Sequence, residues 1–208
     1  MCQMAGYLIY HPKRAVAIFG NRFVHHDSTR GNQDPYVWND PFLHTYCHIT
    51  QMRPEIGQTI LWVSGNNWPA FDRLCCDLVF TVGAKFFWTN SNHISPDDPI
   101  VDSPQAYNEH YRWAHQHPLR RRRRFTLKAD QESFQPQNAK GELIDIVPAL
   151  LRCGLTLEQL RRGLRSGYGS KPMPLGCEAN VVAHWLSERA PVKLWGREIV
   201  ECRAAPRS

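Results

Sequence analysis

The sequence predicts an α+β fold, in which a small antiparallel β-barrel or strongly bent sheet is followed by a helical C-terminal extension. Short runs of β-branched and aromatic residues alternate with turn residues through the first 130 positions, which is typical of strands joined by short loops. Helix signals are concentrated in the rest of the chain. We therefore expect a β-rich core over residues 1–130 and a mainly helical extension over 131–208, packed on that core.

The N-terminal part of the chain contains three short candidate strands. Gly6–Tyr10 and Ala15–Phe19 are apolar runs, and His11–Arg14 between them includes a proline and predicts a turn. A polar loop is expected over His25–Pro41, after which Thr45–Thr50 again favours a strand.

The central strands carry the strongest pattern. Thr59–Ser64 (TILWVS) and Asp77–Val82 (DLVFTV) are rich in β-branched and aromatic residues, and Gly83 is expected to end the second of them. The proline and glycine of Arg53–Gln58 predict a tight turn before the first, because proline fixes φ and glycine permits positive φ. Phe125–Lys128 alternates apolar and polar residues, as a half-buried strand does.

Two helices are expected in the C-terminal region. Thr156–Gln159 has the capping-box pattern, which predicts a helix that begins there and ends near Gly167. Glu178–Arg189 predicts a second helix, whose inward face is expected to contain Val181, Val182, Trp185 and Leu186. A last strand is expected at Val192–Trp195 or at Glu198–Cys202.

Composition argues against several classes of protein. No stretch approaches about 20 consecutive apolar residues, so a membrane-spanning helix is not expected. The first residues lack the basic and apolar regions of a secretory signal. The seven cysteines include no CxxC pair, which favours a reduced cytoplasmic setting with cysteines as small core residues. Glycine-rich phosphate-binding motifs are missing, and no cofactor is expected.

Charge is distributed unevenly along the chain. Residues 1–110 contain 7 Lys and Arg against 10 Asp and Glu, whereas residues 111–208 contain 18 against 9. The strongest basic feature is a run of arginines followed closely by a lysine: Arg120, Arg121, Arg122, Arg123, Arg124 and Lys128. Guanidinium groups bind phosphate in planar, bidentate geometry, so this run predicts contact with nucleic acid or a nucleotide. Arg112, Arg161, Arg162 and Arg165 are expected to extend it, and a solvated strand end is the alternative.

Aromatic residues provide the second requirement for binding bases, which stack on aromatic faces. Trp38 stands in the polar loop and is followed by Asn39 and Asp40, whose amide and carboxylate groups can read a base edge. We expect these three residues to form a binding pocket with Trp62 of the central strand. Trp68, Phe86, Phe87 and Trp88 are further aromatic residues in or beside the predicted sheet, although aromatic residues in strands are more often part of the core.

Histidine and aspartate residues gather in the same part of the chain. The group consists of His25, His26, Asp27, His44 and His48. A spacing of four places the last two histidines on one face of either a strand or a helix, so acid–base or metal chemistry is a hypothesis for this group. No HExxH motif and no cysteine pair with zinc spacing occurs, so a metal is not expected.

A series of short motifs spans residues 36–87: Asn39–Phe42, Cys47, Arg53, Ile56–Ile60, Ser64-Gly65 and Leu78–Phe80. This series resembles the nucleotide modification associated domain proteins and is similar in outline to the EVE and ASCH branches of PUA-like barrels. In those families a basic residue, here Arg53, and an x-G-D-x-[IV] turn lead into a strand, and Gln58 stands here in place of the aspartate. The resemblance covers about a quarter of the chain. It implies a compact PUA-like barrel with a pocket for a modified base.

These features predict a protein that binds nucleic acid or a nucleotide, with modified bases among its targets. The alternative is an enzyme that acts on nucleotides or nucleic acid through the histidine and aspartate group of residues 25–48. A third hypothesis is a partner-binding component of a mobile-element or defence system, because the apolar faces of the C-terminal helices could dock a protein. The expected partners are thus nucleic acid, a nucleotide or a protein, and not a membrane.

Overall fold

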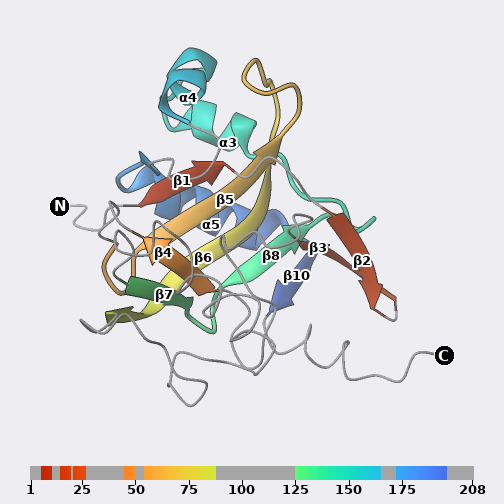
Figure 1. Ribbon diagram of the computed structural model, residues 1–208. Coiled ribbons are helices and arrows are strands. Elements are labelled where there is room, and N and C mark those ends of the chain that lie inside the picture. The colour runs from red at the N-terminus through yellow and green to blue at the C-terminus, as the bar shows by residue number, and fades with distance from the viewer. Residues whose placement is uncertain are drawn as a thin grey trace.

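The computed structural model describes residues 6–10, 15–19, 21–26, 45–49, 54–87, 125–164 and 172–195 (Figure 1). These residues form an α+β fold, as the sequence predicts. A mixed sheet packs against helices on one of its faces, and a two-stranded hairpin stands beside it (Figure 1).

The main sheet contains a path of six strands. Their order is β10 (Val192–Trp195), β8 (Phe134–Gln137), β6 (Leu74–Phe87), β5 (Thr59–Gly65), β1 (Tyr7–Tyr10) and β9 (Met173–Pro174). The second half of β6 leaves this path and pairs with β7 (Phe125–Ala129), which also pairs with β4 (Thr45–Ile49). The hairpin consists of β2 (Ala15–Phe19) and β3 (Arg22–His26).

The expectation of an antiparallel sheet is wrong in part. The sheet is mixed, because β1 lies parallel to β5 with Tyr7 opposite Ile60. The two predicted strands at Gly6–Tyr10 and Ala15–Phe19 form, and the second of them pairs with β3. A parallel neighbour requires a long crossover connection, and the chain between β1 and β5 provides that length. Among the described strands, the path ends at β10 and β9 without closing into a barrel.

β5 is buried on both faces, which explains its continuous apolar run. Leu61 and Val63 belong to the hydrophobic cluster on the helical side of the sheet. Ile60 and Trp62 belong to a second cluster that includes Leu127 of β7. A strand in the interior of a sheet covered on both sides needs this composition, so the predicted strand at Thr59–Ser64 is confirmed.

The helices of the described chain cover one face of the sheet (Figure 1). They are α3 (Val147–Arg152), α4 (Leu157–Gly163) and α5 (Glu178–Arg189). α5 buries Ala179, Val182 and Leu186 at helical spacing, whereas Val181, predicted to face inward, is 57% exposed because it lies one position off this stripe. At the start of β1, a Cβ added to Gly6 would lie 2.2 Å from Ala179 Cβ, so the close approach of strand and helix requires glycine.

The region beyond residue 130 is more than a helical layer. β8 pairs with β6, where Phe134 lies opposite Val79, and β10 pairs with β8. The predicted last strand at Val192–Trp195 is therefore confirmed. Leu150 of α3 and Leu186 of α5 share one hydrophobic cluster with Leu61, so the N- and C-terminal regions contribute to a common core.

The predicted capping box is confirmed at the start of α4. Thr156 Oγ1 accepts a hydrogen bond from Gln159 N at 3.1 Å, and Gln159 Oε1 accepts one from Thr156 N at 2.7 Å. The helix ends at Gly163, earlier than the predicted end near Gly167, which lies outside the described residues. The two hydrogen bonds satisfy N–H groups that the first helical turn leaves without partners.

Removing this cap gives a first testable outcome. Thr156→Ala is expected to lower the free energy of unfolding by about 1 kcal/mol. This corresponds to a decrease in melting temperature of about 2–4 °C for a chain of this size, measured by thermal denaturation. Thr156→Ser keeps the hydroxyl group and should melt close to the unmodified protein. Equal melting temperatures for the alanine and serine variants would show that the cap does not stabilise the fold.

Candidate nucleic-acid interface

Most residues of the predicted site lie outside the described residues. They are Asp27, Trp38, Asn39, Asp40, His44, Arg53, Arg120, Arg121, Arg122, Arg123 and Arg124. For three more, the structure describes the backbone alone: His26 ends β3, His48 lies in β4, and Lys128 lies in β7 opposite Thr45. The binding and catalytic roles expected of these residues therefore remain predictions from the sequence.

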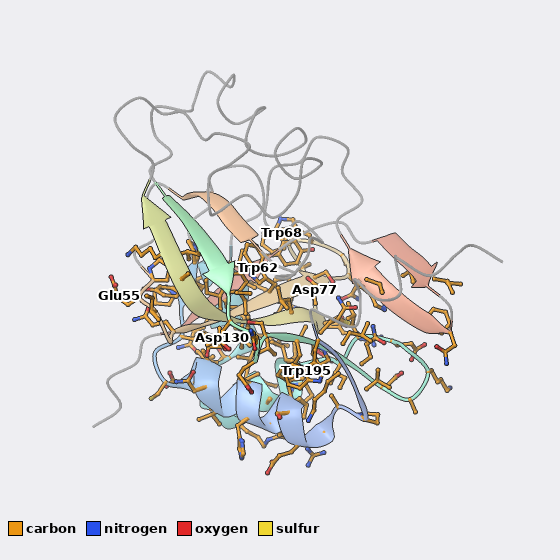
Figure 2. All side chains as sticks on the ribbon, turned by 90° about the horizontal axis from the view of Figure 1, so that it is seen from below. Glu55, Trp62, Trp68, Asp77, Asp130 and Trp195 are labelled. Carbon is orange, nitrogen blue, oxygen red and sulfur yellow. The ribbon has the colours of Figure 1, made fainter. Side chains whose placement is uncertain are left out.

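Trp62 is described in full and belongs to the core. Its side chain is 2% exposed and packs in the second hydrophobic cluster with Ile60, Leu78 and Phe80. Figure 2 labels it within the sheet. A base needs an accessible aromatic face on which to stack, and Trp62 offers almost none in this structure. Its contacts are those of a packing residue.

His25 has a role in holding the β2–β3 hairpin. Its Nε2 lies 2.8 Å from the carbonyl oxygen of Gly141, and its backbone N–H donates to Gln135 Oε1 at 2.9 Å. Among the residues that the structure describes, no group of three or more His, Cys, Asp or Glu side chains is arranged to hold a metal ion. The contacts of His25 therefore connect the hairpin to the rest of the fold.

Two buried glutamines of β8 complete this connection. Gln135 Nε2 donates to the carbonyl oxygens of His25 at 2.8 Å and Asp77 at 3.0 Å. Gln137 Nε2 donates to the carbonyl oxygen of Phe23 at 2.7 Å and to Gln135 Oε1 at 2.9 Å. The side-chain amide of Gln135 thus pairs with His25 through both a donor and an acceptor, as a neighbouring strand would. Glutamine has no local sequence pattern that indicates such a network, because its partners lie far away in the chain.

An aromatic cluster lies where β5 connects to β6. Tyr10 and Trp68 have ring centroids 4.1 Å apart, and Trp68 and Phe71 have centroids 5.7 Å apart with an interplanar angle of 17°. Phe71 is fully buried and Tyr10 is 4% exposed, whereas Trp68 is half-buried. Trp68 is therefore the outermost of the three rings and the one that retains surface for a ligand.

The connection that carries Trp68 is held in place at both ends. The hydroxyl of Tyr10 donates to the carbonyl oxygen of Gly65 at 3.3 Å. Arg161 of α4 donates from Nε to the carbonyl oxygen of Phe71 at 2.8 Å and from a terminal nitrogen to that of Ala70 at 3.2 Å. Figure 1 shows this connection projecting beyond the sheet on the side of α3 and α4. An aromatic platform that is already fixed loses little entropy when a ligand stacks on it.

Polar and charged groups surround this platform. Asn66 and Asn67 precede Trp68 and are exposed, and Asn67 adopts a positive φ of 47°. The Cζ atom of Arg161 lies 6.0 Å from the ring centroid of Phe71, so a guanidinium stands beside the cluster. Arg162 forms an ion pair with Glu158 on the same helix, which partly neutralises it. Stacking surface, amide groups and a guanidinium are the components that bind single-stranded nucleic acid.

A thiol lies near the end of this connection. Burial raises the pKa of Cys75 above its ordinary value, although the charge of Arg73 acts in the opposite direction. A raised pKa leaves little thiolate at neutral pH, and thiolate is the nucleophilic form. Cys75 therefore has the properties of a structural residue and adds no nucleophile to the platform.

Comparison with known proteins adds no family to this description. No protein-family model matches the chain, and searches of curated proteins and of solved structures find no match. None of the described helices has the length and apolar character needed to cross a membrane. The resemblance to PUA-like proteins therefore remains a prediction from the sequence. The contacts around Trp68 are the structural basis for a function.

Proposed function

We propose that this protein binds single-stranded nucleic acid, with Trp68 as the platform on which an unpaired base stacks. The single observation that carries the proposal is the half-buried ring of Trp68, supported from below by Tyr10 and Phe71. A stacking residue needs a rigid position and an accessible surface, and Trp68 has both.

Charge along the chain supports the same proposal. The second half of the sequence has an excess of nine basic over acidic residues, which includes Arg161 beside the platform and the arginine run of residues 120–124. Basic side chains contact the phosphate backbone and release its counterions, which makes the affinity salt-dependent. The resemblance to PUA-like proteins adds modified bases as a target class.

Replacing Trp68 provides the direct test. Trp68→Ala is expected to raise the Kd for a single-stranded oligonucleotide about 5- to 150-fold, because stacking on an aromatic side chain contributes about 1–3 kcal/mol per base. Trp68→Phe keeps an aromatic face and should lose less affinity. Fluorescence anisotropy with labelled single-stranded DNA and RNA, across a series of salt concentrations, measures both variants. Duplex DNA and oligonucleotides with modified bases define the preferred target.

Trp195 offers a matched control. It is also half-buried and packs on Phe134, with ring centroids 5.2 Å apart, but it lies on β10 at one end of the strand order, whereas Trp68 lies between the central strands β5 and β6. Trp195→Ala should reduce stability and leave the affinity of the folded protein unchanged. Equal losses of affinity in the Trp68 and Trp195 variants would contradict the proposal, as would oligonucleotide binding that is absent or independent of salt.

A further inference from the structure

Two arginines lie against one tryptophan where α3 meets α5. Arg152 is in the last turn of α3 and Arg189 in the last turn of α5, and each has its Cζ atom 5.3 Å from the ring centroid of Trp185. The two Cζ atoms are therefore at most twice 5.3 Å, about 10.6 Å, apart. Both arginines are exposed and Trp185 is half-buried, so the ring fixes the position of two accessible guanidinium groups.

This group contains hydrogen-bond donors without matching acceptors. Neither arginine forms an ion pair with another residue in the described ranges. Glu188, next to Arg189 in the chain, lies 3.3 Å from His184 Nε2 instead. The indole Nε1 of Trp185 is buried and has no hydrogen-bond acceptor among the residues that the structure describes. A guanidinium stacked on a ring keeps its in-plane N–H groups available, and these groups match the oxygens of a phosphate.

Stabilisation of the helix ends is a simpler role for the same arginines. A positive charge in the last turn interacts favourably with the partial negative charge at a helix C-terminus. Lysine can serve that role equally well, and it does not require two side chains on the same ring. Two guanidiniums that each lie 5.3 Å from one ring centroid repel each other, and an anion bound to their N–H groups would offset this repulsion.

We propose that Arg152, Arg189 and Trp185 form a binding site for a phosphate group. The phosphate can be a backbone diester of nucleic acid, a terminal monoester or a free phosphate ion, since the same N–H groups recognise all three. This site goes beyond the stacking platform, because it uses α3 and α5 and does not involve Trp68. Its ligand would bridge two helices, so it should also stabilise the fold.

Thermal denaturation of the full chain in inorganic phosphate tests the site. Phosphate is expected to raise the melting temperature by about 2–4 °C relative to chloride at the same ionic strength. Arg152→Gln combined with Arg189→Gln should remove most of this rise. Lys140→Gln, which removes one positive charge from an exposed turn after β8, should retain it. Arg152→Lys preserves the charge at the helix end and should reduce the rise, because lysine lacks the planar fork.

Oligonucleotides with and without a 5′-phosphate identify the source of the phosphate. If the double variant loses only the advantage of the 5′-phosphorylated oligonucleotide, the ligand is a terminal monoester. If it loses affinity for both oligonucleotides equally, the ligand is the backbone. A phosphate-dependent rise that is the same in the unmodified protein, the double variant and Arg152→Lys would overturn the site, and so would the absence of any rise. These outcomes do not depend on Trp68→Ala, which tests the stacking platform separately.

Discussion

Trp62→Ala is expected to lower the free energy of unfolding by about 3–5 kcal/mol, the cost of removing a large aromatic side chain from a core. Trp62 is 2% exposed and lies at the centre of β5, the strand between β6 and β1. Alanine at this position leaves a cavity in a closely packed hydrophobic cluster. β5 is hydrogen-bonded to a strand on each side, so its backbone has little freedom to move into that cavity. Urea denaturation monitored by far-UV circular dichroism measures the change.

The comparison with Trp68 separates packing from binding. Trp62→Phe keeps part of the ring volume and should destabilise the protein less than Trp62→Ala, with little effect on oligonucleotide affinity in the folded protein. Trp68→Ala should destabilise the protein less than Trp62→Ala, because Trp68 is half-buried, and should cause a large loss of oligonucleotide affinity. A stable Trp62→Ala variant that fails to bind oligonucleotide would restore Trp62 to the binding pocket that the sequence analysis predicted.

Local signals predicted the elements whose conformation depends on neighbours in sequence. The helix Glu178–Arg189 has the bounds predicted from its pattern, and the capping box of Thr156 forms as expected. Gly57 has a positive φ of 85° in the predicted turn before β5. In each case a few consecutive residues determine the structure, through an apolar stripe, a cap or the freedom of glycine.

Features set by distant contacts could not be predicted in this way. β6 continues past Gly83, which was expected to end it, because the strand forms an irregularity there and its backbone passes close to Asp130. A Cβ on Gly83 would lie 2.8 Å from Asp130 Cα, so glycine marks a close approach of two backbone segments. The same residue type is compatible with a strand end or a bulge, and only the partner strand distinguishes them.

The candidate site also combines features set by local sequence with features set by distant contacts. Trp68 was recognised as one of several aromatic residues, but its place on the surface depends on Tyr10 and Arg161, which are far away in the sequence. Trp62 lies in the apolar run of β5 and is buried. Residue type and local pattern identify which side chains can stack on a base, and tertiary packing decides which of them is accessible.

Gln135→Leu is expected to lower the free energy of unfolding by about 2–4 kcal/mol. Gln135 is 1% exposed and pairs with both the N–H and the carbonyl oxygen of His25, so leucine leaves these groups without partners. Each buried polar group that loses its partner costs about 1–3 kcal/mol. The total loss of stability is limited, because the β2–β3 hairpin can separate from β8 and its polar groups can then bind water. Thermal denaturation and urea titration measure the loss.

Separation of the hairpin should be visible in local measurements. In Gln135→Leu, amide hydrogen exchange at His25 should accelerate far more than exchange in β5, because local opening then needs less free energy than global unfolding. Gln135→Glu is nearly isosteric but cannot donate to the carbonyl oxygens of His25 and Asp77 when ionised, so it should show the same local effect. Gln137→Leu removes fewer bonds to the hairpin backbone and should give a smaller one. Uniform acceleration across β5 and His25 would instead mean that the hairpin and the sheet unfold as one cooperative unit.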